Sequence, residues 1–122
     1  MVLDTNIVIY FAKPGGEPLS PWVGDPAAEV SVVSRIEALG FPNISAEEKA
    51  GIKKALAVLP EVGLGEAVTE RAIALRQQRR MGLADAIIAA TALERDLSLV
   101  TRNVADFQHI VGLRLINPFD QP

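Results

Sequence analysis

The sequence predicts an α/β sandwich with a central, mainly parallel sheet. Short apolar segments that suit buried strands alternate along the chain with segments of helical periodicity, which is typical of a parallel sheet covered by helices. Hydrophobic residues make up 49% of the chain, which excludes an intrinsically disordered protein. We expect one domain, residues 1–122, because 122 residues can bury one core and are too few for two ordinary ones.

The N-terminal apolar block, residues 2–11, predicts a buried strand that leads into a helix. Asp4, Thr5 and Asn6 interrupt this block and suit the turn between the two elements and the cap of the helix. Residues 13–26 contain four prolines and three glycines, so we expect an irregular connection there.

Two serine-containing motifs predict the starts of the next helices. A second strand is expected at 29–33, followed by a helix that Ser34 caps and that continues through Glu37. Ser45 and Glu48 have the spacing of a capping box, which predicts a helix to about residue 59. Further helices are expected at 66–80 and 83–96, and further strands at 61–64, 97–100 and 113–116.

The composition excludes several classes of site. The chain has no cysteine and one histidine, which excludes disulfide scaffolds, thiolate zinc sites, cysteine nucleophiles and a paired-histidine ribonuclease mechanism. Any metal site must use mainly oxygen ligands, which suits Mg²⁺ or Mn²⁺. The net charge of −3 argues against non-specific coating of nucleic acid. No apolar run is long enough to span a membrane and no signal peptide is recognisable, so we expect a cytoplasmic protein.

Four acids, far apart in the sequence, each stand beside a short apolar segment: Asp4, Glu37, Asp85 and Asp106. Asp4 and Asn103 follow predicted strands, where sites of parallel sheets form, and Glu37 and Asp85 are expected in the first turns of helices. Carboxylates that converge at the edge of a core repel one another, and a hard divalent cation is the usual way to offset that repulsion. The pattern therefore predicts a Mg²⁺- or Mn²⁺-type site.

Four segments of the chain form an ordered set of motifs: VLDTNIVIY at 2–10, SVVSRIEAL at 31–39, LADAIIAATA at 83–92 and LVTRNVADF at 99–107. They resemble the motifs of PIN-domain proteins, and within that family those of VapC-type toxin ribonucleases of type II toxin–antitoxin systems. The closing GLRLINP at 112–118 also resembles the last strand of the family. Their order and spacing carry the resemblance, which implies a PIN-like three-layer α/β/α sandwich.

The resemblance implies the roles of individual residues. In the family the first three acids line a Mg²⁺/Mn²⁺ pocket, so Asp4, Glu37 and Asp85 are the expected metal ligands. Many relatives have an aspartate where this chain has Asn103, and Asp106 fills the adjacent position, so both complete the expected catalytic set. Because Asn103 brings no charge, the number of metal ions at the site, one or two, remains open.

The chemistry of such a site suits hydrolysis of phosphodiesters. A divalent ion held by carboxylates lowers the pKa of bound water for in-line attack and offsets charge on the phosphoryl oxygens. We therefore expect 5′-phosphate and 3′-hydroxyl products. Three side chains are expected to support the ligands by hydrogen bonds: Thr5, Asn6 and Thr101. Four arginines are candidates for substrate contact, although three of them equally suit the basic end of a helix: Arg102, Arg76, Arg79 and Arg80.

The resemblance also implies partners. RNA is the expected substrate, a small cognate antitoxin the expected inhibitor, and a homodimer through the early helices the expected assembly. Residues 13–26 and the helix after Ser45 are candidate contacts for the antitoxin. Two alternatives remain open: a nuclease that uses the same pocket on DNA, and a catalytically weak PIN scaffold that only binds nucleic acid or a partner protein.

Overall fold

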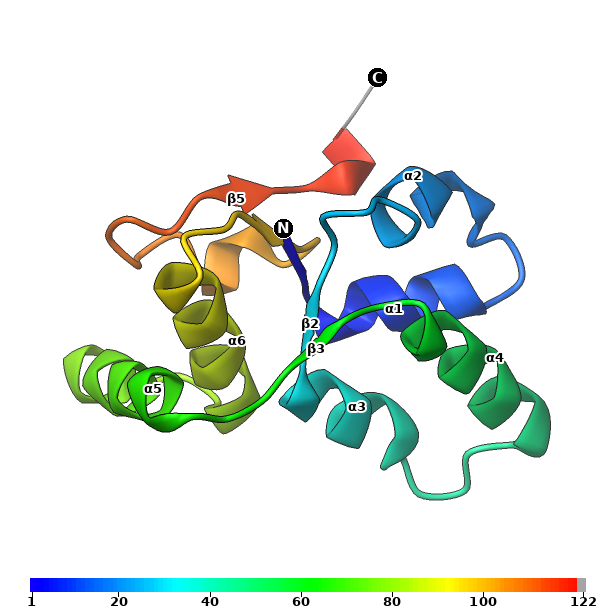
Figure 1. The fold of residues 1–122 in the computed structure, drawn as a ribbon, viewed down its shortest axis with the longest axis horizontal. Helices are drawn as coiled ribbons and strands as arrows, with labels where there is room; N and C mark the ends of the chain where they lie inside the picture. Colours follow the sequence, from blue (N-terminus) through cyan, green and yellow to red (C-terminus); the bar gives the residue numbers. More distant parts are fainter. Residues whose placement is uncertain (121–122) are drawn as a thin grey trace.

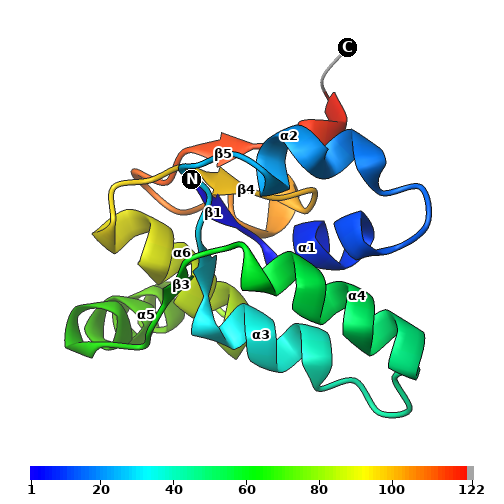
Figure 2. The same cartoon turned by 45° about the vertical axis from the view of Figure 1, so that its right-hand side comes forward.

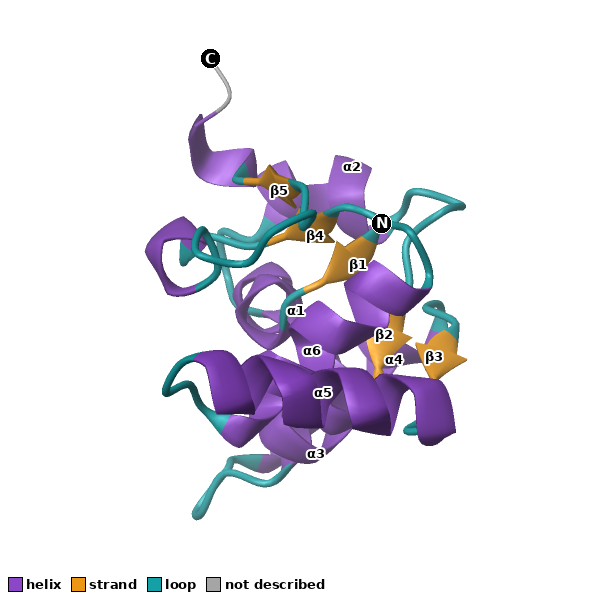
Figure 3. Cartoon of the chain, turned by 90° about the vertical axis from the view of Figure 1, so that its left-hand side faces the viewer, coloured by secondary structure: helices purple, strands orange, loops and turns teal. Residues whose placement is uncertain are grey.

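The strands form the parallel sheet that the sequence predicts. The computed structural model describes residues 1–120 and, within them, five short strands. They are β1 (Val2–Leu3), β2 (Val30–Ser31), β3 (Glu61–Val62), β4 (Leu99–Val100) and β5 (Leu115–Ile116). The orders β1–β4–β5 and β2–β3 are both parallel. Glu29 joins the two groups: its N–H donates to Met1 O at 2.8 Å, and its C=O accepts from Leu3 N at 2.9 Å. Figure 3 shows the strands in orange, with β4 between β1 and β5 and with β2 beside β3.

Helices cover the strands on both sides. They are α1 (Thr5–Ala12), α2 (Ser20–Val23), α3 (Val32–Leu39), α4 (Ala46–Ala57), α5 (Glu66–Gln78) and α6 (Leu83–Glu94). In Figure 1, α5 and α6 lie on the left of the strands and α1, α2 and α4 on the right. Helices α1, α3 and α4 also contact one another (Figure 2). The predicted three-layer α/β/α sandwich is thus confirmed.

The core lies on both faces of the sheet because successive strand residues point in opposite directions. Val2 and Leu99 pack in the cluster beneath α5 and α6. Leu3 and Val100, the next residues along the same strands, pack in the cluster beneath α1 and α4. All four side chains are fully buried. The ends of β1 and β4 are therefore held rigidly, and the residues that follow them have a fixed position.

Two local predictions need correction. Ser34 does not cap α3: the helix begins at Val32, and Ser31 caps it by accepting from Val33 N at 3.1 Å. Because α3 begins at Val32, strand β2 ends at Ser31. The β-branched residues Val32 and Val33, which favoured a strand, belong to the first turn of the helix. Residues 13–26 are not wholly irregular, because α2 forms there with its half-buried Trp22 packed against the core.

The second serine motif forms as predicted. Ser45 Oγ accepts from Glu48 N at 3.0 Å, and Glu48 Oε1 accepts from Ser45 N at 3.4 Å, which completes the capping box of α4.

Candidate active site

Asp4 is held in place in the site by its position after β1 and by its hydrogen bonds. It follows β1 directly, caps α1 and is 4% exposed. Its Oδ1 accepts from Thr5 N at 2.8 Å, and its Oδ2 accepts from Thr101 Oγ1 at 2.7 Å. Because Thr101 stands directly after β4, the adjacent parallel strand, the edge of the sheet supplies both the carboxylate and its hydrogen-bond donor.

A chain of hydroxyl groups connects α1 to α3. Thr5 Oγ1 lies 2.6 Å from Glu37 Oε1 and 2.9 Å from Ser34 Oγ. An ionised carboxylate can only accept, so Thr5 donates its single hydroxyl proton to Glu37 and accepts from Ser34. Glu37 lies in the second turn of α3, not in its first turn as predicted, because the helix begins earlier than expected.

The sequence-based interpretation missed the role of Ser34. It is fully buried and three residues before Glu37, so both side chains lie on the same face of α3. That spacing was the available signal, but it was interpreted as a helix cap.

The acids affect one another electrostatically. Asp85 is half-buried in the first turn of α6, and its pKa is raised to about 6, first by burial and then by the charges of Asp4, Asp106 and Glu37. Burial also raises the pKa of Asp4; the hydrogen bonds from Thr101 and Thr5 oppose this shift, and Glu37 and Asp106 add to it. The structure therefore brings the four predicted acids to one place.

The donor set suits a hard cation, although the acids are not closed around one. Within residues 1–120, no three His, Asp or Glu side chains are close enough together to hold a metal ion. Each oxygen of Asp4 accepts one hydrogen bond, so lone pairs remain for a ligand. A divalent cation would stabilise such an all-carboxylate set, in which the charges of neighbouring acids add to the raised pKa values of Asp4 and Asp85. Glu37 and Asp85 would have to move toward Asp4 to bind it.

The remaining predicted site residues are placed differently. Asn103 and Asp106 are exposed, and Asn103 N donates to Thr101 Oγ1 at 3.0 Å. Asn6 forms no hydrogen bond with Asp4 in the described part of the chain; it lines a cavity of about 700 Å³ between α1 and α4. The catalytic roles of Asn103 and Asp106 and the supporting role of Asn6 stay predictions.

The four arginines predicted to contact substrate lie in two places. Arg102 is exposed, two residues after β4. Arg76 is in the last turn of α5, and its Nε donates to Met81 O at 3.3 Å. Arg79 and Arg80 are exposed in the turn between α5 and α6. Substrate contact by all four stays a prediction.

We expect Thr101→Val to destabilise the protein by about 2 kcal/mol, because a buried carboxylate oxygen loses its charge-assisted hydrogen bond. Thermal and chemical denaturation measure this change. Thr91→Val is the matched control, since Thr91 is equally buried but donates to the Ile87 carbonyl within its own helix. The control is expected to cost less than about 1 kcal/mol. Equal losses in both variants would show that Asp4 gains nothing special from Thr101.

Comparison with known proteins decides the family. The sequence profile described as PIN domain matches residues 1–113. The chain belongs to the PIN-domain family. Ribonuclease VapC1 of Rickettsia felis is 30% identical to this PIN-domain chain over an alignment of 128 positions, which covers 95% of the chain and 94% of that protein.

Two solved structures share the fold of this PIN-domain chain. A toxin–antitoxin complex from Klebsiella pneumoniae contains a chain with 28% identity and a TM-score of 0.78, with 98% of each chain covered. VapBC-1 from nontypeable Haemophilus influenzae has 26% identity and a TM-score of 0.75, again with 98% of each chain covered. The predicted PIN fold and VapC-type resemblance are confirmed.

Within residues 1–120, no helix is long and apolar enough to cross a membrane.

Proposed function

We propose that this PIN-domain protein is a metal-dependent endoribonuclease and the toxin of a toxin–antitoxin pair. The observation that carries the proposal is the mutual influence of Asp4, Glu37, Asp85 and Asp106: burial, and after it the charges of the other three acids, raise the pKa of Asp85 to about 6. Structural ion-pair networks also perturb carboxyl groups, but these acids have no basic partner among the described ion pairs. The likeness to Ribonuclease VapC1 of Rickettsia felis supports RNA as the substrate.

The residues of this chain divide the work in the proposed site. Asp4, Glu37 and Asp85 would hold a divalent cation, Mg²⁺ with Mn²⁺ as a substitute, which supplies Lewis acidity at the phosphodiester. Thr101 orients Asp4, and Thr5 orients Glu37. Because these two side chains are already restrained, they lose less conformational freedom when they bind the cation. The exposed Asn103 and Asp106 would face water and substrate.

The first test is cleavage of a mixed RNA pool by purified protein. We expect cleavage with Mg²⁺ or Mn²⁺, none with EDTA, and products with 5′-phosphate and 3′-hydroxyl ends. The same assay with DNA of matched sequence separates a ribonuclease from a DNA nuclease. No cleavage with either metal would favour the alternative of a catalytically weak scaffold, which the uncharged Asn103 and the open spacing of the acids support.

We infer that a small antitoxin binds in the groove beside the site. The cavity of about 700 Å³ between α1, residues 41–45 and the start of α4 is lined by apolar and charged side chains. Asn6 lines it as well, so an occupant would lie next to Asp4. The toxin–antitoxin complexes among the similar structures support such a partner. Adding the antitoxin to the cleavage assay should stop cleavage, whereas unchanged cleavage would contradict this inference.

A homodimer is also part of the proposal. Four large apolar side chains are 46–65% exposed on or beside α3, α5 and α6, where a second copy could cover them: Ile36, Leu64, Ile73 and Leu83. Scattered apolar residues are normal on a surface, but Leu64, Ile73 and Leu83 line one hollow of about 340 Å³. This grouping supports an interface at α5 and α6, and the exposed Ile36 of α3 lies outside the hollow.

A further inference from the structure

A second hollow, of about 240 Å³, lies at the far end of α1, where the C-terminal turn η3 (Pro118–Asp120) meets the loop after the helix. Two aromatic and two basic side chains line it together with Pro14: Tyr10, Phe119, Lys13 and Arg102. The rings of Tyr10 and Phe119 pack edge to face, with centroids 5.8 Å apart. Phe119 is 44% exposed although it is large and apolar, so solvent reaches the aromatic pair.

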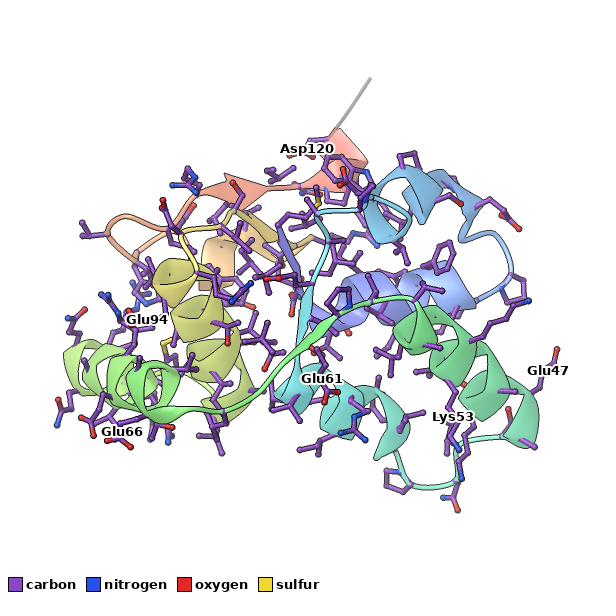
Figure 4. The ribbon with its side chains drawn as sticks, in the orientation of Figure 1. Glu47, Lys53, Glu61, Glu66, Glu94 and Asp120 are labelled. Atoms are coloured by element: carbon purple, nitrogen blue, oxygen red, sulfur yellow. The ribbon has the colours of Figure 1, made fainter. Side chains whose placement is uncertain are left out.

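Arg102 is stacked in this hollow rather than paired. Its guanidinium carbon lies 4.6 Å from the centroid of the Phe119 ring and 5.6 Å from that of Tyr10. Four other arginines each form an ion pair with an acid: Arg35, Arg71, Arg95 and Arg114. Two of the acids in these pairs, Glu61 and Glu94, are labelled in Figure 4. No hydrogen bond or ion pair connects Arg102 to any other described residue. Stacking fixes the plane of the guanidinium and leaves its N–H donors available.

The loop on the other side of the hollow has little freedom. Gly15 has a φ of +86°, which favours glycine. A Cβ at Gly16 would lie 2.3 Å from the carbonyl oxygen of Phe11, so only glycine allows the loop to pass this close to the end of α1. The path of the loop at this end of α1 therefore depends on both glycines.

We propose that this hollow binds a nucleotide of single-stranded RNA next to the cleavage site. A base would stack on the exposed ring of Phe119, which the perpendicular ring of Tyr10 supports from the side, and Arg102 and Lys13 would contact the phosphates on either side. Aromatic faces beside cations are the usual platform for unpaired bases, whose faces are free to stack. The inference rests on the proposed ribonuclease function and adds to it a subsite for one nucleotide beside the cleavage site.

The position of the hollow suits this role. Arg102 follows Thr101, whose hydroxyl donates to Asp4. Tyr10 is six residues beyond Asp4, which corresponds to about 9 Å along α1. A strand that crosses the acids would therefore reach the hollow within a few nucleotides. Asp120, labelled in Figure 4, belongs to the same turn as Phe119 and limits how many phosphates can approach from that side.

The test measures RNA binding without cleavage, by fluorescence anisotropy of a short labelled single-stranded RNA in EDTA. Phe119→Leu keeps an apolar side chain but removes the ring, and Arg102→Gln removes the charge and most of the donors. Each is expected to weaken binding about ten-fold. Arg114→Gln is the matched control, because Arg114 is exposed but paired with Asp96, and it should bind like wild type. The same RNA as a duplex should bind more weakly to the wild-type protein.

Crosslinking provides a readout that a structural role of Phe119 would not affect. RNA that contains 4-thiouridine should crosslink to Tyr10 or Phe119, as located by mass spectrometry of the peptides. Wild-type affinity in both folded variants, or crosslinks only elsewhere, would overturn the proposal even if the wild-type protein cleaves RNA. No binding or cleavage by wild type would overturn both proposals. If the variants bind the antitoxin more weakly but bind RNA like wild type, the hollow belongs to the protein partner. That result would also overturn the RNA proposal.

Discussion

Asp85→Asn is expected to abolish RNA cleavage and, at the same time, to stabilise the metal-free protein. Cleavage should fall at least about 100-fold, because even the hydrogen-bond partners of metal ligands contribute 10- to 100-fold and Asp85 would be a ligand itself. The stability should rise because the Asp85 carboxylate is half-buried among three other acids, which raises its pKa to about 6. Asparagine keeps the shape of the side chain and removes the repulsion.

The sign and size of the stability change follow from the pKa. Asp85 has a folded-state pKa above its usual 3.8, so its contribution to stability is complete below about pH 4 and is lost as the pH rises through 6. The full shift corresponds to about 3 kcal/mol, and because the group is half-exposed we expect about 1–2 kcal/mol after solvent screening. The melting temperature of the variant should therefore exceed that of wild type at pH 7 by about 5 °C, and by little at pH 4.

Asp96→Asn is the control for this experiment. Asp96 is 91% exposed in its side chain and pairs only with Arg114 at the surface. Its φ of 53° suits asparagine as well as aspartate. We expect unchanged cleavage and a stability within about 0.5 kcal/mol of wild type. An Asp85→Asn protein that cleaves like wild type would remove Asp85 from the proposed site, and a lower melting temperature would show that its charge is stabilising.

Two serine motifs show how far local sequence could predict this fold. Ser34 and Glu37 have the same spacing as Ser45 and Glu48, and both pairs suit a capping box. Only the second pair forms one, because the first is next to a buried strand and Ser31 takes its place as the cap. The alternation of apolar segments was sufficient for the sandwich, whereas the starts of elements depended on which groups tertiary packing buries.

The acids of the site could be predicted, but most of their partners could not. Asp4 and Asp85 stand at the boundaries of apolar segments, and that position is visible in the sequence. The hydrogen bond from Thr5 to Glu37 joins residues 32 positions apart, and only the packing of α1 against α3 creates it. The stacking of Arg102 on Phe119 similarly requires the end of the chain to return to α1, for which no local pattern exists.

Cation affinity should depend steeply on pH between 5 and 7. In the proposed site, binding requires the Asp85 carboxylate, and with a pKa of about 6 that group is mostly protonated at pH 5 and mostly ionised at pH 7. Mn²⁺ should therefore bind about ten-fold more weakly at pH 5 than at pH 7, and the raised pKa of Asp4 can only steepen this dependence. Titration calorimetry of metal-free protein measures the affinity, and buffers with different ionisation enthalpies measure the protons released.

Glu37→Gln separates the effect of pH on Asp85 from a general loss of affinity. Removing the Glu37 charge should weaken Mn²⁺ binding at every pH, yet the dependence on pH should persist because Asp85 still has to lose its proton. In Asp85→Asn, by contrast, the part of the pH dependence of Mn²⁺ binding that is due to Asp85 should be absent. An affinity that is flat from pH 5 to pH 7 in the wild-type protein would mean that Asp85 does not bind the cation, since a carboxyl group with a pKa near 6 cannot become a ligand without releasing a proton.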